Sequence, residues 1–246
     1  MLALPSEAKD LHCLEAKLAK LGITAKSFAA DISDRQQISK VVKEIANQFG
    51  AIDIFISNAA IESMGVFELQ SEQIIEKTVT VNLLAPILIT RKLLPHMLLR
   101  KSGHIIVMSS FAGKMGLPYQ AVYSATKAGL IKWALGMKRE FKNSGVSFST
   151  ISPTYVSKAG MYADILHMSG KRLTTPKIAG EVTPMQVAKA VVCSIINDKT
   201  DVVVGSPLLR FASATNELFP NVVSGMLNLL GISRYNKKLA YIHRES

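Results

Sequence analysis

The sequence predicts an α/β protein in which a doubly wound parallel sheet carries helices on both of its faces. Short apolar runs, which suit buried strands, alternate along the chain with longer segments whose apolar positions recur at helical spacing. Gly22, Gly50 and Gly103 stand where three of these longer segments should end. Such alternation is typical of right-handed βαβ units, whose strands lie parallel in one sheet.

The periodic segments also predict the domain organisation. Strands are expected at residues 1–4, 23–29, 52–56, 104–108, 146–151 and 201–205. Helices are expected at residues 6–21, 31–49, 71–99, 123–143 and 184–196. Ser71 can cap the third helix, and Pro184 opens the last one. We expect one domain over residues 1–205, with a substrate loop at about 158–183, followed by a helical extension at 206–246.

The composition is that of a globular enzyme, because 48% of the 246 residues are apolar and 19% are charged. The formal net charge of +11 favours anionic partners, although a solvated basic surface is the simpler explanation. Cys13 and Cys193 form no CxxC pattern, which argues against a disulfide framework or a cysteine-based metal site. The chain lacks both the ~20-residue apolar run of a membrane span and the features of a signal peptide, so a cytoplasmic protein is expected.

Tyr123 and Lys127 carry the clearest chemistry. They are four residues apart in a predicted helix, so they lie on one helical face, one turn apart. A lysine ammonium favours a nearby phenolate and lowers its pKa, so Tyr123 could exchange a proton with a carbonyl or alcohol oxygen. Ser109 and Ser110 close the preceding strand, where a hydroxyl could hold the same oxygen. Each motif alone is common by chance, and their order along one βαβ chain gives them weight.

Other residues of interest stand where strands end. Asp31 ends the second predicted strand, Asn58 ends the third, and Pro153 follows the strand at 146–151. In open α/β sheets, ligands bind beyond the carboxyl ends of the strands. We therefore expect a binding site along that edge of the sheet.

In this order the motifs resemble the short-chain dehydrogenase/reductase superfamily, whose members have a Rossmann-like fold. The resemblance covers about residues 1–205. It rests on the acidic turn Asp31-Ile32-Ser33-Asp34; on Ser57-Asn58-Ala59-Ala60, similar to the family's Asn-Asn-Ala-Gly motif; on Val81-Asn82-Leu83; on Ser110, thirteen residues before Tyr123; on Tyr123-Ser124-Ala125-Thr126-Lys127; and on Ser152-Pro153-Thr154-Tyr155-Val156, similar to the Pro-Gly loop over the nicotinamide.

The resemblance implies an NAD(P)-dependent oxidoreductase that interconverts a carbonyl and a secondary alcohol. Tyr123 would be the acid/base, Lys127 would hold the ribose hydroxyls and lower the Tyr123 pKa, and Ser110 would orient the substrate oxygen. Asn82, through its backbone, would seat a water that links Lys127 to solvent. The residues implied to line the cofactor are Asp31, Ile32, Asn58, Ala59, Ala60, Tyr123, Lys127, Pro153 and Val156.

The chain departs from the family pattern at its start. The family's first strand and Gly-rich turn, which place the pyrophosphate on a helix N-terminus, are absent, and residues 1–4 already resemble the second strand. Either the working protein carries this unit ahead of Met1, which we favour because the catalytic motifs are intact, or the chain is a truncated form with poor cofactor affinity. Loss of the unit would leave parallel edges unpaired. Ala60 and Thr154 also replace glycines, and Lys158 stands where a threonine is usual.

Cofactor, substrate and partners are less directly encoded. An acidic residue just after the second strand of such a fold binds the free ribose of NAD(H). The residues at this place are Pro5, Ser6 and Lys9, and no acid is well placed among them, which favours NADP(H) over NAD(H). The apolar loop at 158–183 suits a small hydrophobic or lipid-like substrate, or packs as a lid. The tail at 206–246 could be a peripheral membrane element, a pocket wall or an oligomer contact. The family implies a homodimer or homotetramer.

Two other functions compete with the enzyme. A truncated, inactive scaffold or binding subunit is motivated by the missing Gly-rich unit. A nucleic-acid binder rests on net charge alone, and neither base-stacking aromatics nor a basic recognition helix is evident, so we expect no nucleic acid partner.

Overall fold

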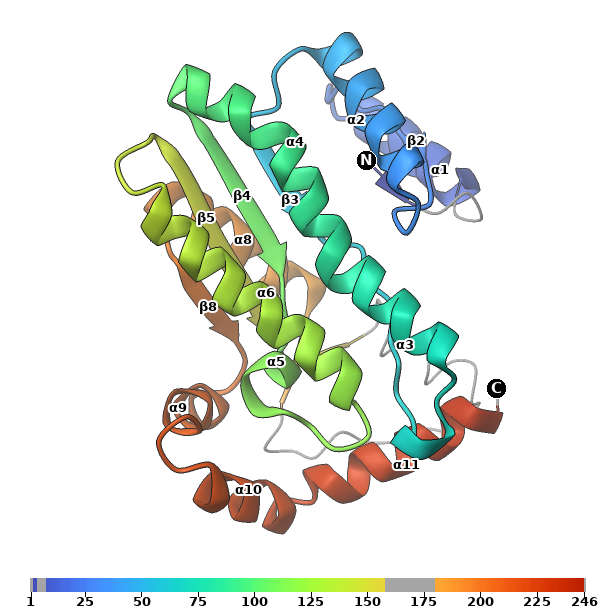
Figure 1. Cartoon of the computed structure of the whole chain (residues 1–246), viewed down its shortest axis with the longest axis vertical. Coiled ribbons are helices and arrows are strands. Elements are labelled where there is room, and N and C mark those ends of the chain that lie inside the picture. The colour runs from blue at the N-terminus through green and yellow to red at the C-terminus, as the bar shows by residue number, and fades with distance from the viewer. Residues whose placement is uncertain (1, 4–7, 158–179, 246) are drawn as a thin grey trace.

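A computed structural model of the chain describes residues 2–3, 8–157 and 180–245 (Figure 1). Among these residues, four parallel strands form the central sheet in the order β3-β4-β5-β8, and two pairs of short parallel strands stand beside it. The central strands are β3 (Ile54–Ser57), β4 (Gly103–Met108), β5 (Val146–Pro153) and β8 (Asp201–Val204), and the short pairs are β1 (Leu2–Ala3) with β2 (Phe28–Ala29) and β6 (Tyr155–Val156) with β7 (Glu181–Val182).

Helices connect these strands and continue beyond the last of them. They are α1 (Ala8–Ala19), α2 (Arg35–Phe49), α3 (Glu72–Val79), α4 (Ala85–Arg100), α5 (Phe111–Met115), α6 (Ala121–Glu140), α8 (Pro184–Asn197), α9 (Pro207–Thr215), α10 (Pro220–Leu229) and α11 (Ile232–Glu245). The hydroxyl of Ser71 caps α3, and a capping box between Thr183 and Gln186 opens α8 just before Pro184, so both predicted starts are confirmed.

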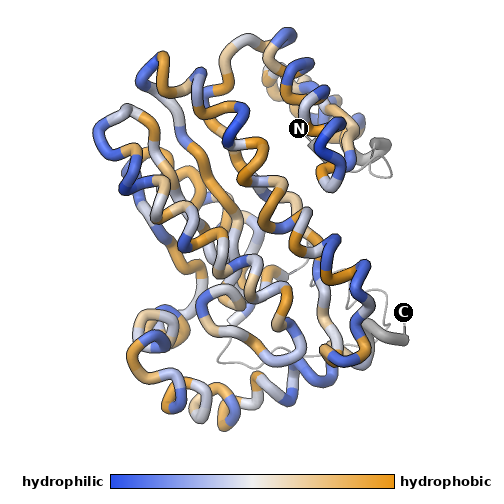
Figure 2. The backbone as a smooth tube through the Cα atoms, viewed as in Figure 1, coloured by the Kyte–Doolittle hydropathy of each residue, from blue (hydrophilic) through white to orange (hydrophobic). Residues whose placement is uncertain are grey.

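Both faces of the central sheet are covered, as the sequence predicted. In Figure 1, α4 and α6 lie in front of the sheet and α8 lies behind it. Ile105 and Val107 of β4 share a buried cluster with α4 and α6, whereas Ile106 and Met108 pack toward α8. Side chains alternate along a strand, so a strand covered on both faces must be apolar throughout. The tube is accordingly hydrophobic along most of β4 in Figure 2.

The sheet is divided where the sequence predicted a missing strand. β1 and β2 pair only with each other in the described part of the chain, and the outer edge of β3 has no strand partner there. Ile54 and Ile56 of β3 are each 44% exposed, whereas most of β4 is fully buried. An unpaired edge with exposed apolar side chains is unusual for a parallel sheet. The rest of the fold keeps the predicted doubly wound arrangement.

The tail packs against the carboxyl end of the sheet. Leu227 of α10 and Ile232 at the start of α11 share a buried cluster with Tyr123 at the beginning of α6. Further along α11, Leu239 packs against Met64 in the loop that follows β3. The tail therefore forms a wall beside the start of α6. In the described residues, no helix has the length and apolarity needed to cross a membrane.

Candidate active site

The predicted catalytic residues meet where β4 ends and α6 begins. Ser110 follows β4 and caps α5, its hydroxyl accepting a hydrogen bond from the Ala112 N–H at 3.1 Å. Tyr123 and Lys127 lie in the first two turns of α6 and are 6% and 3% exposed. The three side chains therefore gather at the carboxyl edge of the sheet, where ligands bind in open α/β folds.

Close packing of α5 on α6 holds Ser110 against Tyr123. Gly113 of α5 leaves no room for a side chain, because a Cβ there would lie 2.7 Å from the backbone carbonyl carbon of Lys127. The Ser109 hydroxyl donates to the Lys127 carbonyl oxygen at 2.9 Å and fastens the strand end to the same helix. The Ser110 side chain lowers the pKa of the Tyr123 phenol in this arrangement.

Tyr123 keeps its proton at neutral pH. Burial raises the pKa of its phenol well above the ordinary value, the negative charge of Glu62 raises that pKa further, and the hydrogen bond with Ser110 lowers it. The sequence predicted a pKa lowered by Lys127, but the phenol has lost most of its contact with water, and this cost to the charged form dominates. A protonated phenol is the state that donates a proton to a developing alkoxide.

Lys127 is a buried cation beside the phenol. Its Nζ donates to the Met108 carbonyl oxygen at 2.8 Å and lies 5.6 Å from the centroid of the Tyr123 ring. Burial lowers the pKa of Lys127 to about 8, and the charge of Glu62 partly opposes this fall. Lys127 therefore remains mostly charged at neutral pH and can stabilise negative charge on the phenol oxygen.

Asn82 joins the loop after β3 to α6. It is fully buried in a π-helical turn (Thr80–Leu84) between α3 and α4. Its Oδ1 accepts from the Ile61 N–H and its Nδ2 donates to the Ile61 carbonyl, both at 2.8 Å, while Nδ2 lies 3.5 Å from Thr126 Oγ1. The sequence predicted a role for the Asn82 backbone, and the structure adds this role for its side chain. A π-helical turn is common at functional sites.

Most predicted cofactor residues follow the ends of the central strands. Asn58 and Ala59 are exposed and Ala60 is half-buried, directly after β3. Pro153 is the last residue of β5, and Val156 lies half-buried in β6. Of the substrate loop predicted at 158–183, residues 158–179 lie outside the described residues, and Lys158 is one of them.

Asp31 and Ile32 belong to the connection between β2 and α2, next to the separate short sheet. Asp31 Oδ1 accepts from the N–H and the hydroxyl of Ser33 at 2.8 and 2.7 Å, and these hydrogen bonds lower the pKa of Asp31. The Ile32 side chain is buried in the main core, so this residue has only its backbone to offer a ligand.

The described residues fit the nicotinamide half of a dinucleotide. Ala59 and Ala60 keep side chains small beside the end of β3, and Lys127 provides a cation at the same edge. The buried Ser152 hydroxyl, next to Pro153, has no hydrogen-bond partner among the described residues. For the pyrophosphate, by contrast, the sequence contains no Gly-rich turn between a strand and a helix.

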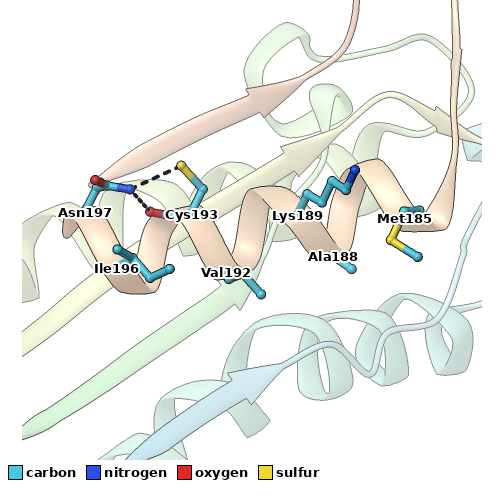
Figure 3. A pocket seen from close by; sticks show the side chains of 7 residues that line it. All are labelled: Met185, Ala188, Lys189, Val192, Cys193, Ile196 and Asn197. Carbon is cyan, nitrogen blue, oxygen red and sulfur yellow. Dashed lines mark hydrogen bonds between the residues drawn. The ribbon is translucent and has the colours of Figure 1, made fainter.

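A surface pocket of about 370 Å³ lies elsewhere, along one side of α8 (Figure 3). Its lining residues are Met185, Ala188, Lys189, Val192, Cys193, Ile196 and Asn197. None of them is a predicted site residue, and no acid or phenol accompanies the single lysine. The pocket on α8 is therefore not the candidate active site.

Glu62 is a residue of the site that sequence analysis missed. It is partly exposed, in the loop after β3, and accepts a hydrogen bond from the Ser63 N–H at 3.1 Å. Burial raises the pKa of Glu62 to about 7, while the Ser63 N–H and the charge of Lys127 lower it. The available signal was a lone carboxylate just beyond the Ser57–Ala60 motif, in a segment with few charges.

Comparisons with known proteins give the family. The sequence model described as "short chain dehydrogenase" matches residues 1–169. Ketoacyl reductase HetN of Nostoc sp. is 35% identical over an alignment 253 positions long, which covers 97% of this chain and 86% of that protein. Human dehydrogenase/reductase SDR family member 7C is 28% identical, over 82% of this chain and 65% of its own length. A solved structure, a variant of actinorhodin polyketide ketoreductase with NADPH, shares the fold at 22% identity with a TM-score of 0.75, over 82% of this chain and 84% of that one. The chain belongs to the short-chain dehydrogenase family.

Proposed function

We propose that this chain is an NAD(P)-dependent oxidoreductase that interconverts a carbonyl and a secondary alcohol through Ser110, Tyr123 and Lys127. One arrangement supports the proposal: the buried, protonated phenol of Tyr123 lies beside the Lys127 ammonium, and Ser110 at the end of β4 acts on the same phenol. Relatives named as ketoacyl and 3-oxoacyl-[acyl-carrier-protein] reductases support the reaction class.

The chain's own residues manage the proton. The nicotinamide, when bound, supplies or accepts the hydride. In the reducing direction Tyr123 donates its phenolic proton to the substrate oxygen, and the Ser110 hydroxyl donates a hydrogen bond to the same oxygen. Lys127 stabilises the phenolate that Tyr123 leaves behind. We assign to the Asn82 backbone the water through which a proton returns from solvent.

The proposed substrate is a small hydrophobic or lipid-like carbonyl. A 3-oxoacyl thioester is the first compound to test, because HetN and the Staphylococcus aureus 3-oxoacyl-[acyl-carrier-protein] reductase FabG, 35% and 31% identical, bear names for this chemistry. Solved neighbours carry NADPH, NADH or 5-hydroxy-NADP. For this chain we propose NADP(H), since no acid is well placed at Pro5, Ser6 or Lys9 to bind a free ribose.

Turnover by the wild type and by Tyr123→Phe tests the reaction. With NADPH or NADH and a panel of hydrophobic ketones and 3-oxoacyl thioesters, we expect the variant to lose about 1000-fold in kcat, since the proton donor is removed. Its thermal unfolding should match the wild type. Comparable turnover by the folded variant would overturn the mechanism.

A binding or scaffold role without turnover is the second candidate. It is favoured by the outer edge of β3, which has no strand partner among the described residues. Thermal unfolding with and without NADPH and NADH separates the two candidates, because a ligand at a hundred times its Kd stabilises a fold by about 2.7 kcal/mol. A cooperative transition that neither nucleotide shifts supports the scaffold role.

We also propose that the chain is cytoplasmic and forms a homodimer or homotetramer, with peripheral membrane contact through the tail. Light scattering after size exclusion measures the oligomeric state. The membrane contact is motivated by apolar tail side chains that remain exposed, among them Phe211 at 67%, Val222 at 71% and Leu229 at 90%.

A further inference from the structure

Asn236 is a buried polar residue of the tail that the proposed mechanism does not use. It lies in the second turn of α11, which runs across the lower end of the molecule in Figure 1, and it is 0% exposed. Its Oδ1 accepts a hydrogen bond from the Tyr155 hydroxyl at 2.9 Å, and its Nδ2 donates to the Pro118 carbonyl oxygen at 3.5 Å. One amide therefore joins the tail to two segments that are 81 and 118 residues away in the sequence.

The first of these segments, around Tyr155, belongs to the expected cofactor edge. Tyr155 is the first residue of β6 and stands between Pro153 and Val156, which the sequence predicts to line the cofactor. Its side chain packs against the buried cluster that contains Phe111, the first residue of α5. The position of Tyr155 therefore bears both on the expected cofactor loop and on the helix that Ser110 caps.

The second segment leads into α6 through a strained residue. Tyr119 follows Pro118 and has a φ of 65°, in the left-handed region that a bulky side chain rarely adopts. Its side chain packs against the buried cluster that contains Leu239 of α11. Such a conformation persists only where the surrounding contacts hold it in place. The hydrogen bond from Asn236 adds to these contacts, and Tyr123 follows only four residues after Tyr119.

We propose that Asn236 is a positioning residue of the site, whose amide holds the Tyr155 segment at a fixed spacing from the segment that leads to Tyr123. The inference rests on the proposed function, because it concerns the geometry of the same reaction. The neighbouring Tyr235 supports the contact, since its ring meets that of Tyr155 edge to face, with the centroids 5.6 Å apart and the planes at 85°.

An amide suits this place because it accepts and donates at the same time. The Pro118 carbonyl can only accept, so it needs the NH₂ side of Asn236, and this leaves the amide oxygen for the Tyr155 hydroxyl. Leucine has a similar volume but offers neither group. Asn236→Leu therefore fills the space and removes both hydrogen bonds, whereas Tyr155→Phe keeps the ring and removes one of them.

Loss of the fixed spacing should lower turnover more than nucleotide binding. A small displacement between reacting groups costs rate steeply, while the groups that bind the nucleotide remain present. We expect kcat to fall by at least about tenfold in Asn236→Leu and by about fivefold in Tyr155→Phe, with KM for the nucleotide changed by less than about threefold. The double variant should be no slower than Asn236→Leu, because both changes remove the same hydrogen bond.

Amide hydrogen exchange of the whole chain, measured by mass spectrometry, tests the positioning role without any substrate. The Gln120 and Ser157 N–H groups donate backbone hydrogen bonds within the two joined segments. We expect peptides that cover residues 117–120 and 154–157 to exchange about tenfold faster in both variants. A role confined to the stability of α11 would speed exchange in that helix alone.

Two control variants change the same kinds of group elsewhere in the tail. Asn221→Leu makes the amide-to-leucine change at an exposed position of α10. Tyr241→Phe removes the hydroxyl of a tyrosine on α11 that is 46% exposed. Both should leave turnover and exchange at the wild-type level. If Asn236→Leu does not fold, Tyr155→Phe decides, because it keeps the ring and its packing.

The inference is supported if both segments exchange faster and kcat falls in the folded variants, with non-additive losses, while the controls match the wild type. Wild-type exchange at both segments, or faster exchange in α11 alone, overturns it. So does faster exchange with an unchanged kcat. If no form of the chain turns over any substrate, the proposed function fails, yet the exchange measurement still decides whether Asn236 fixes the two segments.

Discussion

Several side chains at the centre of this protein support chemistry and structure together. Asn82 is the clearest of them, because its amide pairs with both backbone groups of Ile61 and so fixes the loop that carries Asn58 and Glu62. The loop has left the sheet, so its backbone N–H and C=O groups have no neighbouring strand to bond with. They need hydrogen-bond partners from other parts of the chain. One buried amide therefore links the predicted cofactor edge to α6.

Replacing Asn82 by alanine should destabilise the fold. Asn82 is 0% exposed, and its amide makes a 2.8 Å hydrogen bond to each of the Ile61 N–H and carbonyl groups. The substitution removes both partners from this buried place. We expect the free energy of unfolding to fall by about 3 kcal/mol, measured by urea denaturation followed by circular dichroism. Asn221→Ala, on the exposed side of α10, is the control and should change little. Equal denaturation midpoints for the two variants would show that the amide is dispensable.

At the scale of elements, the contact between α5 and α6 sets the geometry of the site. α5 is a short helix, begun by the Ser110 cap, and it approaches the backbone of α6 at Gly113. This approach places the strand end against Tyr123 and Lys127. Only a residue without a side chain permits it.

Gly113→Ala should therefore damage activity more than the same change elsewhere. A Cβ at residue 113 would meet backbone atoms of α6 at 2.7–2.8 Å, which forces the two helices apart. We expect a loss of about 2 kcal/mol in stability and of at least about tenfold in kcat, measured by thermal unfolding and steady-state turnover. Gly136→Ala is the matched control in α6, where a Cβ meets nothing within 4 Å. That change should be neutral or stabilising by up to about 1 kcal/mol, and similar losses in both variants would contradict the argument.

The sequence predicted the larger elements because their signals are local. The run at 104–108 is apolar on both faces and was recognised as a buried strand, and it forms most of β4. The strands β6 and β7 were missed, since two-residue strands carry no periodic pattern. The expected helix at 71–99 is interrupted by a π-helical turn around Asn82, which depends on tertiary packing and leaves no mark in the periodicity.

The same distinction holds for the candidate site. Ser110, Tyr123 and Lys127 could be placed beforehand, because their spacing along a βαβ unit fixes which strand end and which helix face they occupy. Glu62 could not be placed beforehand, because only the fold brings it into hydrogen-bond distance of Gln120 on another loop. The sequence also predicted a lowered pKa for Tyr123, since spacing shows a neighbouring cation but not the depth of burial.

At the scale of the whole molecule, burial is uneven. The central sheet is covered on both faces, while the tail leaves large apolar side chains at the surface beside basic ones. Figure 2 shows a hydrophobic stretch at the outside of the molecule where the chain enters α10. Exposed cations on the tail are Arg210, Arg234, Lys237 and Lys238, whereas Glu217 is its exposed acid among residues 206–241.

This combination predicts that the protein binds vesicles of anionic lipid. Apolar side chains enter the interface and the cations meet the headgroups, so binding should weaken as salt rises. Serine at Phe211, Val222 and Leu229 removes three apolar contacts, each worth about 1 kcal/mol when partly buried, so vesicle affinity should fall by about a hundredfold.

Vesicle flotation measures this effect, and a second triple variant controls for lost apolar surface in general. Leu21, Leu99 and Ile196 are 73%, 85% and 75% exposed but lie outside the tail, on or beside α1, α4 and α8. Serine at these three positions should leave flotation unchanged. If both triple variants float as the wild type does, or if the wild type does not bind anionic vesicles, the predicted membrane contact is wrong. The oligomeric state of the tail variant then tests whether the exposed tail residues serve a contact between chains.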